Sequence, residues 1–117
     1  MTTDEKITAL LRTICPRTYC DFAPTDTQRP YCTYQVIGGD SLSYLDAVVP
    51  NKENVEVQIS IWSDSRLEAT ALAKQVEAAL ITATNMQASS LGAAASDFDA
   101  DMSVRSSQQD FSIWADR

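Results

Sequence analysis

The chain has 117 residues, of which 44% are hydrophobic and 21% charged, and its formal net charge is −7. This length and composition predict a single globular domain over residues 1–117. The acidic balance argues against tight nucleic-acid binding, which needs clustered Lys and Arg, and no apolar run approaches the ~20 residues that cross a bilayer, so we expect no membrane partner.

The sequence contains no histidine, and its three cysteines are Cys15, Cys20 and Cys32. Ser-His-Asp and Cys-His catalysis and His-liganded metal sites are therefore excluded within one chain. The cysteine spacing matches no zinc motif, and an odd count does not suggest a disulfide framework. We expect no enzyme activity and no cofactor, with structural roles for the thiols.

The first predicted element is an amphipathic helix that Thr2 or Thr3 can cap, and Thr2 has capping-box spacing to Glu5. Apolar residues then recur with the spacing of one buried helical face: Ile7, Leu10, Leu11 and Ile14. Pro16 ends the helix, because the residue before a proline is disfavoured in the helical region. Residues 17–30 are expected to form an irregular connection, with Tyr19 and Phe22 anchoring it to the core.

Residues 31–37 and 54–62 are predicted strands, and the second alternates apolar with polar side chains along its length. The connection between them, residues 38–53, is long for so small a chain. Its larger apolar residues are Leu42, Tyr44, Leu45, Val48 and Val49. This is more apolar surface than a solvated loop needs. Two alternatives stay open: the loop docks on a neighbouring subunit, or it folds back over its own sheet.

Residues 63–65 supply caps for a second predicted helix, which runs to about Thr82, and Ser65 with Glu68 is expected to form a second capping box. Its expected buried face consists of Ala69, Leu72, Ala73, Val76, Ala79 and Leu80. Residues 83–95 are expected to be a flexible connection, residues 97–105 a half-solvated strand, residues 106–108 a turn, and residues 110–114 a last strand.

The order of predicted elements is therefore α-β-β-α-β-β. It predicts a two-layer α+β domain, with a mainly antiparallel four-stranded sheet and two amphipathic helices on one face.

The segment DFDAD is the carboxylate cluster of the chain, with acids at Asp97, Asp99 and Asp101. As a calcium loop it would supply the first three ligand positions, but Met102 stands where the turn glycine belongs and Gln108 where the bidentate glutamate belongs. A solvated or interface-facing acidic strip is the favoured interpretation over a metal site.

Trp62 and Trp114 each fall on the polar side of a predicted strand. Tryptophan is enriched in protein interfaces, so a core position and a place in a subunit interface both remain open.

The order of motifs resembles the tail-completion, or tail-terminator, proteins of long-tailed bacteriophages, prophages and gene transfer agents. An N-terminal helix is followed by the segments APTDTQRP, PYCTYQVIGG, VEVQISIW, SDSRLEATALAKQVEAAL and DFSIW. The resemblance spans nearly the whole chain, and its sharpest parts are residues 30–34 and 55–80.

The resemblance implies a virion structural protein that is assembled in the host bacterial cytoplasm. It implies a homo-oligomeric ring, typically a hexamer, at the head-proximal end of the tail, which ends the tail tube and forms the head–tail joining surface. The implied partners are the tail tube protein and a head-side connector protein, and DNA passes through the ring without specific binding.

Within such a ring, we expect Trp62, Trp114 and the apolar residues of the 38–53 loop at subunit interfaces, and the DFDAD acids in the lumen or in solvent. Two alternatives remain: a head-side neck or connector protein, and a monomeric protein-binding module that uses the 38–53 loop.

Overall fold

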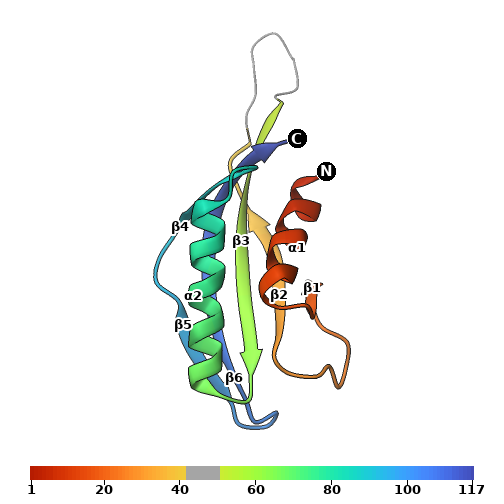
Figure 1. Ribbon diagram of the computed structural model, residues 1–117, viewed down its shortest axis with the longest axis vertical. Helices are drawn as coiled ribbons and strands as arrows, with labels where there is room; N and C mark the ends of the chain where they lie inside the picture. The colour runs from red at the N-terminus through yellow and green to blue at the C-terminus, as the bar shows by residue number, and fades with distance from the viewer. Residues whose placement is uncertain (42–50) are drawn as a thin grey trace.

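The computed structural model describes residues 1–41 and 51–117. In it, two helices lie side by side on one face of a mixed sheet of six strands (Figure 1). The helices are α1 (Thr3–Ile14) and α2 (Arg66–Thr82). The strands are β1 (Thr18–Cys20), β2 (Tyr31–Gly38), β3 (Lys52–Ser63), β4 (Gln87–Ser90), β5 (Ala95–Asp99) and β6 (Val104–Asp116). The predicted α+β class and both helices are confirmed.

The strand order is β1-β2-β3-β6-β4, and β5 pairs with β6 along the same edge that β4 uses. Every pair is antiparallel except β1–β2, which is parallel. The prediction of four strands was therefore wrong by two. Both missed strands, β1 and β4, are short and lie in segments without apolar alternation, so their pairing depends on the neighbouring strand rather than on a local pattern.

The C-terminal hairpin turns earlier than predicted. The expected turn at residues 106–108 lies inside β6, where these residues pair with the end of β3. The turn is instead made by residues 100–103, because the Asp99 carboxylate accepts hydrogen bonds from the backbone N–H groups of Asp101 and Met102. Such an Asx turn competes successfully with the weak turn preference of paired serines.

Both helices begin at the predicted caps. Thr2 and Glu5 form the complete capping box. At α2, the Ser65 hydroxyl accepts the Glu68 N–H at 3.4 Å, but the Glu68 carboxylate accepts a hydrogen bond from the Ser63 hydroxyl at 2.6 Å instead of returning to the cap. The second capping box is therefore half formed.

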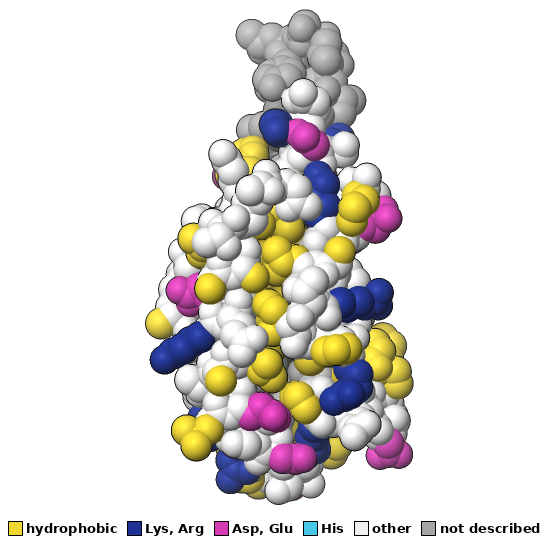
Figure 2. All heavy atoms as spheres, in the orientation of Figure 1, with side chains coloured by type: hydrophobic (Ala, Val, Ile, Leu, Met, Phe, Trp, Pro, Cys, Tyr) yellow, Lys and Arg dark blue, Asp and Glu magenta, His cyan; other side chains and the backbone are white. Residues whose placement is uncertain are grey.

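The core lies between the helices and the sheet. Ile7 and Leu11 of α1 and Val76 and Leu80 of α2 are buried against the inward residues of the central strands, which include Val57, Ile59, Ile61, Phe111 and Ile113. Figure 2 shows apolar side chains along the seam between the two helices.

Phe22 was expected to anchor the connection of residues 17–30 to the core but is 77% exposed, so that prediction was wrong. Neither described helix is long and apolar enough to cross a membrane.

Candidate functional site

The five apolar residues predicted for a subunit interface within the 38–53 loop lie outside the described residues. They are Leu42, Tyr44, Leu45, Val48 and Val49. The described ends of this loop are Gly39 to Ser41 and Asn51, at the end of the sheet where β2 stops and β3 starts. Gly39 packs tightly there, because a Cβ atom on it would overlap the backbone carbonyl of Asn54.

The sheet has a face that the helices leave uncovered, and its side chains are mainly polar. We call it the helix-free face, and its central members are Gln35, Glu56, Gln58, Gln108, Asp110 and Ser112. Hydrogen bonds across strands hold this face together, from Gln108 Nε2 to Ser60 Oγ at 3.2 Å and from Asn54 Nδ2 to Ser112 Oγ at 2.9 Å. Its central charges, on Glu56 and Asp110, are both negative.

Both predicted interface tryptophans lie half-buried on the helix-free face. Trp62 stacks on Tyr31, with ring centroids 6.1 Å apart, and its Nε1–H donates to Thr33 Oγ1 at 3.1 Å. Trp114 lies at the other end of the face, between Asn54 of β3 and Gln87 of β4. The polar parity expected from the sequence thus holds, and the indole N–H of Trp62 has a partner within its own chain.

The three acids of the DFDAD segment are exposed but do not share one strand. Asp97 and Asp99 belong to β5, whereas Asp101 lies in the turn. The predicted strand through residue 105 was therefore wrong, and the acidic strip is a hairpin tip. No group of three potential metal-ligating side chains occurs among residues 1–41 and 51–117.

Three arginines hold this hairpin against the rest of the molecule; we call Arg29, Arg66 and Arg105 the arginine clasp. Arg29 donates to Asp64 Oδ1 at 2.7 Å, to the Met102 carbonyl at 2.8 Å and to the Ser103 carbonyl at 3.0 Å. Each contact joins the loop before β2 to the start of α2 or to the turn between β5 and β6.

The other two members of the clasp act from α2 and β6. Arg66 donates to the Ser106 carbonyl at 2.8 Å and to the Asp97 carbonyl at 2.7 Å. Arg105 donates to the Asp64 carbonyl at 3.1 Å and lies over the Phe98 ring, 4.8 Å from its centroid. Sequence reasoning missed the clasp, because its members are separated by 37 and 39 positions and share no motif.

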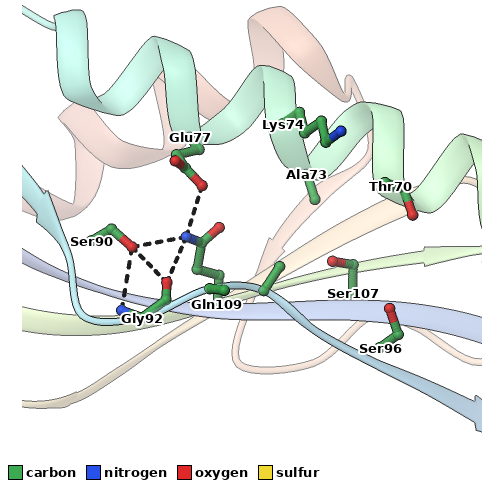
Figure 3. Close-up of a pocket in the computed structure, with 11 residues that line it drawn as sticks. Thr70, Ala73, Lys74, Glu77, Ser90, Gly92, Ser96, Ser107 and Gln109 are labelled. Atoms are coloured by element: carbon green, nitrogen blue, oxygen red, sulfur yellow. Dashed lines mark hydrogen bonds between the residues drawn. The ribbon is translucent and has the colours of Figure 1, made fainter.

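A groove of about 450 Å³ runs between α2 and the segment that joins β4 to β5 (Figure 3). Gln109 lies at its base, 6% exposed, and its Nε2 is 2.9 Å from Glu77 Oε2, Ser90 Oγ and the Gly92 carbonyl. An amide nitrogen carries two hydrogens, so three acceptors share them. The network ties α2 to the β4–β5 segment, and its polar atoms are occupied by one another.

Burial makes two of the cysteines poor nucleophiles. Loss of solvation raises the pKa of Cys15, and it raises the pKa of Cys32 to about 12. Reactivity requires the thiolate, which these surroundings disfavour. The predicted structural role therefore agrees with the positions of Cys15 and Cys32, while Cys20 is exposed on β1.

The fold resembles that of one chain in a solved structure. The chain superposes on a chain of a solved structure described as "Virion of native gene transfer agent (GTA) particle", with a TM-score of 0.57 and 18% sequence identity, over 98% of this chain and 87% of that one. At this identity the likeness concerns the fold alone. A comparison with curated proteins gives no match.

The family follows from the sequence. The model of the family described as "Tail completion protein gp17" matches residues 1–116. The chain therefore belongs to the tail completion protein gp17 family, and it is a structural protein of the phage tail. The resemblance found from the order of motifs is confirmed.

Proposed function

We propose that this protein assembles into a closed ring, a hexamer, at the head-proximal end of the tail, where it ends the tail tube and forms the surface that the head joins. The match of the tail completion family over residues 1–116 carries this proposal. Its direct partners are then the tail tube protein on one side and a head-side connector protein on the other. Assembly takes place in the host cytoplasm.

We propose that the apolar residues of the 38–53 loop contribute to the contact between subunits. Five large apolar side chains within eight positions, 42 to 49, exceed what a solvated connection needs. Replacing Leu45 and Val49 together with Asp should dissociate the ring and leave a folded monomer, because two carboxylates cannot be desolvated in an apolar contact. An intact ring would remove the loop from the interface.

Trp62 and Trp114 are further proposed contact residues, at opposite ends of the helix-free face. Their half-buried rings leave apolar surface that a partner can cover. Trp114→Ala is the cleaner test, since the Trp62 ring also stacks on Tyr31 and its loss would disturb the sheet. Weaker assembly with an unchanged melting temperature of the monomer supports the proposal for Trp114, and unchanged assembly contradicts it.

The charge of the ring suits a channel for DNA. A net charge of −7 per copy and the exposed acids Asp97, Asp99 and Asp101 would repel the phosphate backbone, so DNA would slide through rather than adhere. We propose a lumen-facing position for these three acids.

Light scattering coupled to gel filtration, over a hundredfold range of concentration, tests the ring directly. A mass of several subunits supports it. If the chain is monomeric throughout, purified tail tubes should be added, because assembly can wait for the tube. Binding to tubes then retains the proposal. Binding to the head-side connector alone would indicate a neck protein, and a monomer that binds neither would indicate a separate protein-binding module.

A further inference from the structure

The sheet has two open edges at one level, and their geometry shows how copies of this chain could pair. On one side β1 covers only Cys32 to Tyr34 of β2, so no described strand pairs with the outer side of residues 35–38. On the other side β4 is the last strand of the path, so within the described residues the outer side of Gln87–Ser90 is also unpaired. Natural sheets usually protect such edges with charges or prolines. Neither stretch contains one.

The two open edges lie at the same height in the sheet. Val36 pairs with Val57, Val57 pairs with Phe111, and Phe111 pairs with Ser90. One continuous row of paired residues therefore runs from the β2 edge to the β4 edge. In Figure 1 the end of β2 lies just to the right of β3 and the strand β4 to its left, at similar height.

The strand directions also match. Three successive antiparallel pairs separate β2 from β4, so these two strands run in opposite directions. If a second copy is placed beside the first in the same orientation, its β4 lies antiparallel to the β2 of the first copy. The antiparallel alternation then continues across the contact without interruption.

Backbone groups at both edges point outward. Cys32 N–H donates to Arg17 and the Tyr34 carbonyl accepts from Asp21, on the side of β2 away from β3. Alternation along the strand directs the N–H and carbonyl of Val36 the same way. On β4, Leu91 N–H bonds inward to the Asp110 carbonyl, so alternation directs the backbone groups of Ala88 outward.

Exposed apolar side chains flank both edges. Val36 and Ile37 are each 43% exposed at the β2 edge. At the β4 edge, Leu91 directly follows the strand. Ile81 lies one helical turn after Glu77 on α2, and the Glu77 carboxylate bonds to Gln109 beside β4, so both residues face this edge. Ile81 and Leu91 are 48% and 51% exposed. Strand pairing would cover these groups together.

We infer that the β2 edge of one copy pairs with the β4 edge of the next copy and that this strand pairing closes the ring. The inference rests on the ring proposed above and names the surface that makes it. Because the edges lie at one level, each added copy is not displaced along the strands, so the head-to-tail contact closes on itself instead of climbing into a helix.

The widths of the two layers decide which face points inward. At the level of the contact each copy spans four strands, about 19 Å at ~4.8 Å per strand, and its two helices need about 20 Å side by side. A helix layer as wide as its sheet fits only on the convex side of a ring, where room increases outward. The central part of the helix-free face, with Glu56 and Asp110, therefore lines the channel, and Trp62 and Trp114 lie at its two ends.

The size of the channel is consistent with this orientation. Six copies would place 24 strands around a circle of ~37 Å diameter at the backbone, by the same strand spacing. That leaves room for a DNA duplex inside the layer of side chains. Below the contact, β1 and β5 occupy the two edges, so the pairing is confined to residues 35–38 and 87–90.

Proline substitution tests the pairing. Val36→Pro removes an outward N–H without touching a bond between β2 and β3, and Val36→Thr is the matched control because it keeps the N–H and the branched shape. Light scattering should show that Val36→Pro raises the concentration at which half of the rings dissociate roughly tenfold or more, and that Val36→Thr changes it much less. Equal ring stability for wild type and Val36→Pro, with both folded by circular dichroism, overturns the inference.

Cross-linking gives a second test that does not depend on the proline variant folding. In a Cys20→Ser background, a chain with both Val36→Cys and Ser90→Cys, the two positions that share one row, should form a ladder of covalent oligomers with a short bis-maleimide. Each single variant should form none, because a head-to-tail contact never brings two identical positions together. Dimers of a single variant, or no ladder from the double variant in an intact ring, overturn the inference.

Failure of this inference and failure of the proposed function have different signatures. A wild-type chain that neither oligomerises nor binds tubes removes the proposed function. A wild-type ring that persists in Val36→Pro removes the β2–β4 pairing and leaves the function intact. If the variant forms rings but no longer binds tubes, the β2 edge belongs to the tail tube contact, and the inference is again wrong.

Discussion

Arg29 should stabilise the acidic hairpin mainly through two backbone carbonyls rather than through its ion pair. Its guanidinium bonds to Asp64, Met102 and Ser103, and its side chain is 20% exposed while that of Asp64 is 76% exposed. A pair with so exposed a carboxylate contributes at most about 1 kcal/mol. The two bonds to carbonyls contribute about 1 kcal/mol each, the value of an ordinary hydrogen bond, because the turn is exposed.

Arg29→Gln should therefore lower the free energy of unfolding by about 2–3 kcal/mol, and Asp64→Asn by no more than about 1 kcal/mol. For a chain of this length, 1 kcal/mol corresponds to roughly 4 °C in melting temperature, so the expected decreases are about 8–12 °C and at most about 4 °C. The Asn variant is the matched control because it keeps the Asp64 carbonyl, which accepts from Arg105.

Urea unfolding followed by circular dichroism measures both variants. Protein concentration and assembly state must be the same in each sample, since oligomerisation adds to apparent stability. If the two substitutions cost the same free energy, the carbonyl bonds contribute nothing and the reasoning about the clasp is refuted.

Three further predictions concern the loop entry, the thiols and the first helix cap. Gly39→Ala should destabilise the chain more than Gly38→Ala, because both glycines have positive φ but only at Gly39 would a Cβ overlap the Asn54 carbonyl; equal unfolding free energies would contradict this. Iodoacetamide should modify Cys20 in the native protein, whereas Cys15 and Cys32 should react only after unfolding, because burial raises their pKa values. Peptide mass spectrometry after timed labelling shows which cysteine is modified first. Rapid labelling of Cys32 in the native protein would be inconsistent with its buried position. The Thr2 backbone N–H and hydroxyl bonds lower the pKa of Glu5, so the contribution of Glu5 to stability is present above its unfolded-state pKa and is lost as pH falls through its folded-state pKa. Glu5→Gln should thus lower the melting temperature at neutral pH and cease to do so in acid. A pH-independent difference in melting temperature would exclude the carboxylate as the cause.

The elements that sequence reasoning placed correctly have strong local signals. The face of α1 through Ile7 and Leu11, and the alternation of Val57, Ile59 and Ile61 in β3, follow from the periods of helix and strand alone. Thr2 and Ser65 were identified as caps because the first backbone N–H groups of a helix lack partners within the helix, and a Thr or Ser side chain supplies an acceptor for one of them. The polar parity of Trp62 and Trp114 also follows from alternation.

The candidate assembly surfaces had weaker signals. β4 has no hydrophobic pattern, so nothing in Gln87–Ser90 marks it as the open edge of a sheet. The turn at residues 100–103 depends on the Asp99 carboxylate, which accepts hydrogen bonds from two backbone N–H groups. Composition does not distinguish a turn at these residues from one at the serines that follow. The family resemblance rested on structural motifs. These identified the family but did not locate the surfaces that its members use in assembly.

By itself, the sequence determined the two helices, the central strands, the acidic character and the membership of a tail completion family, because each depends on local periodicity, capping or composition. Tertiary structure alone decided that Arg29, Arg66 and Arg105 converge on one hairpin and that the open edges of β2 and β4 share one level. The physical reason is that strand order and register are set by which edges find partners across long separations in the chain, and those pairings leave no periodic trace in the residues themselves.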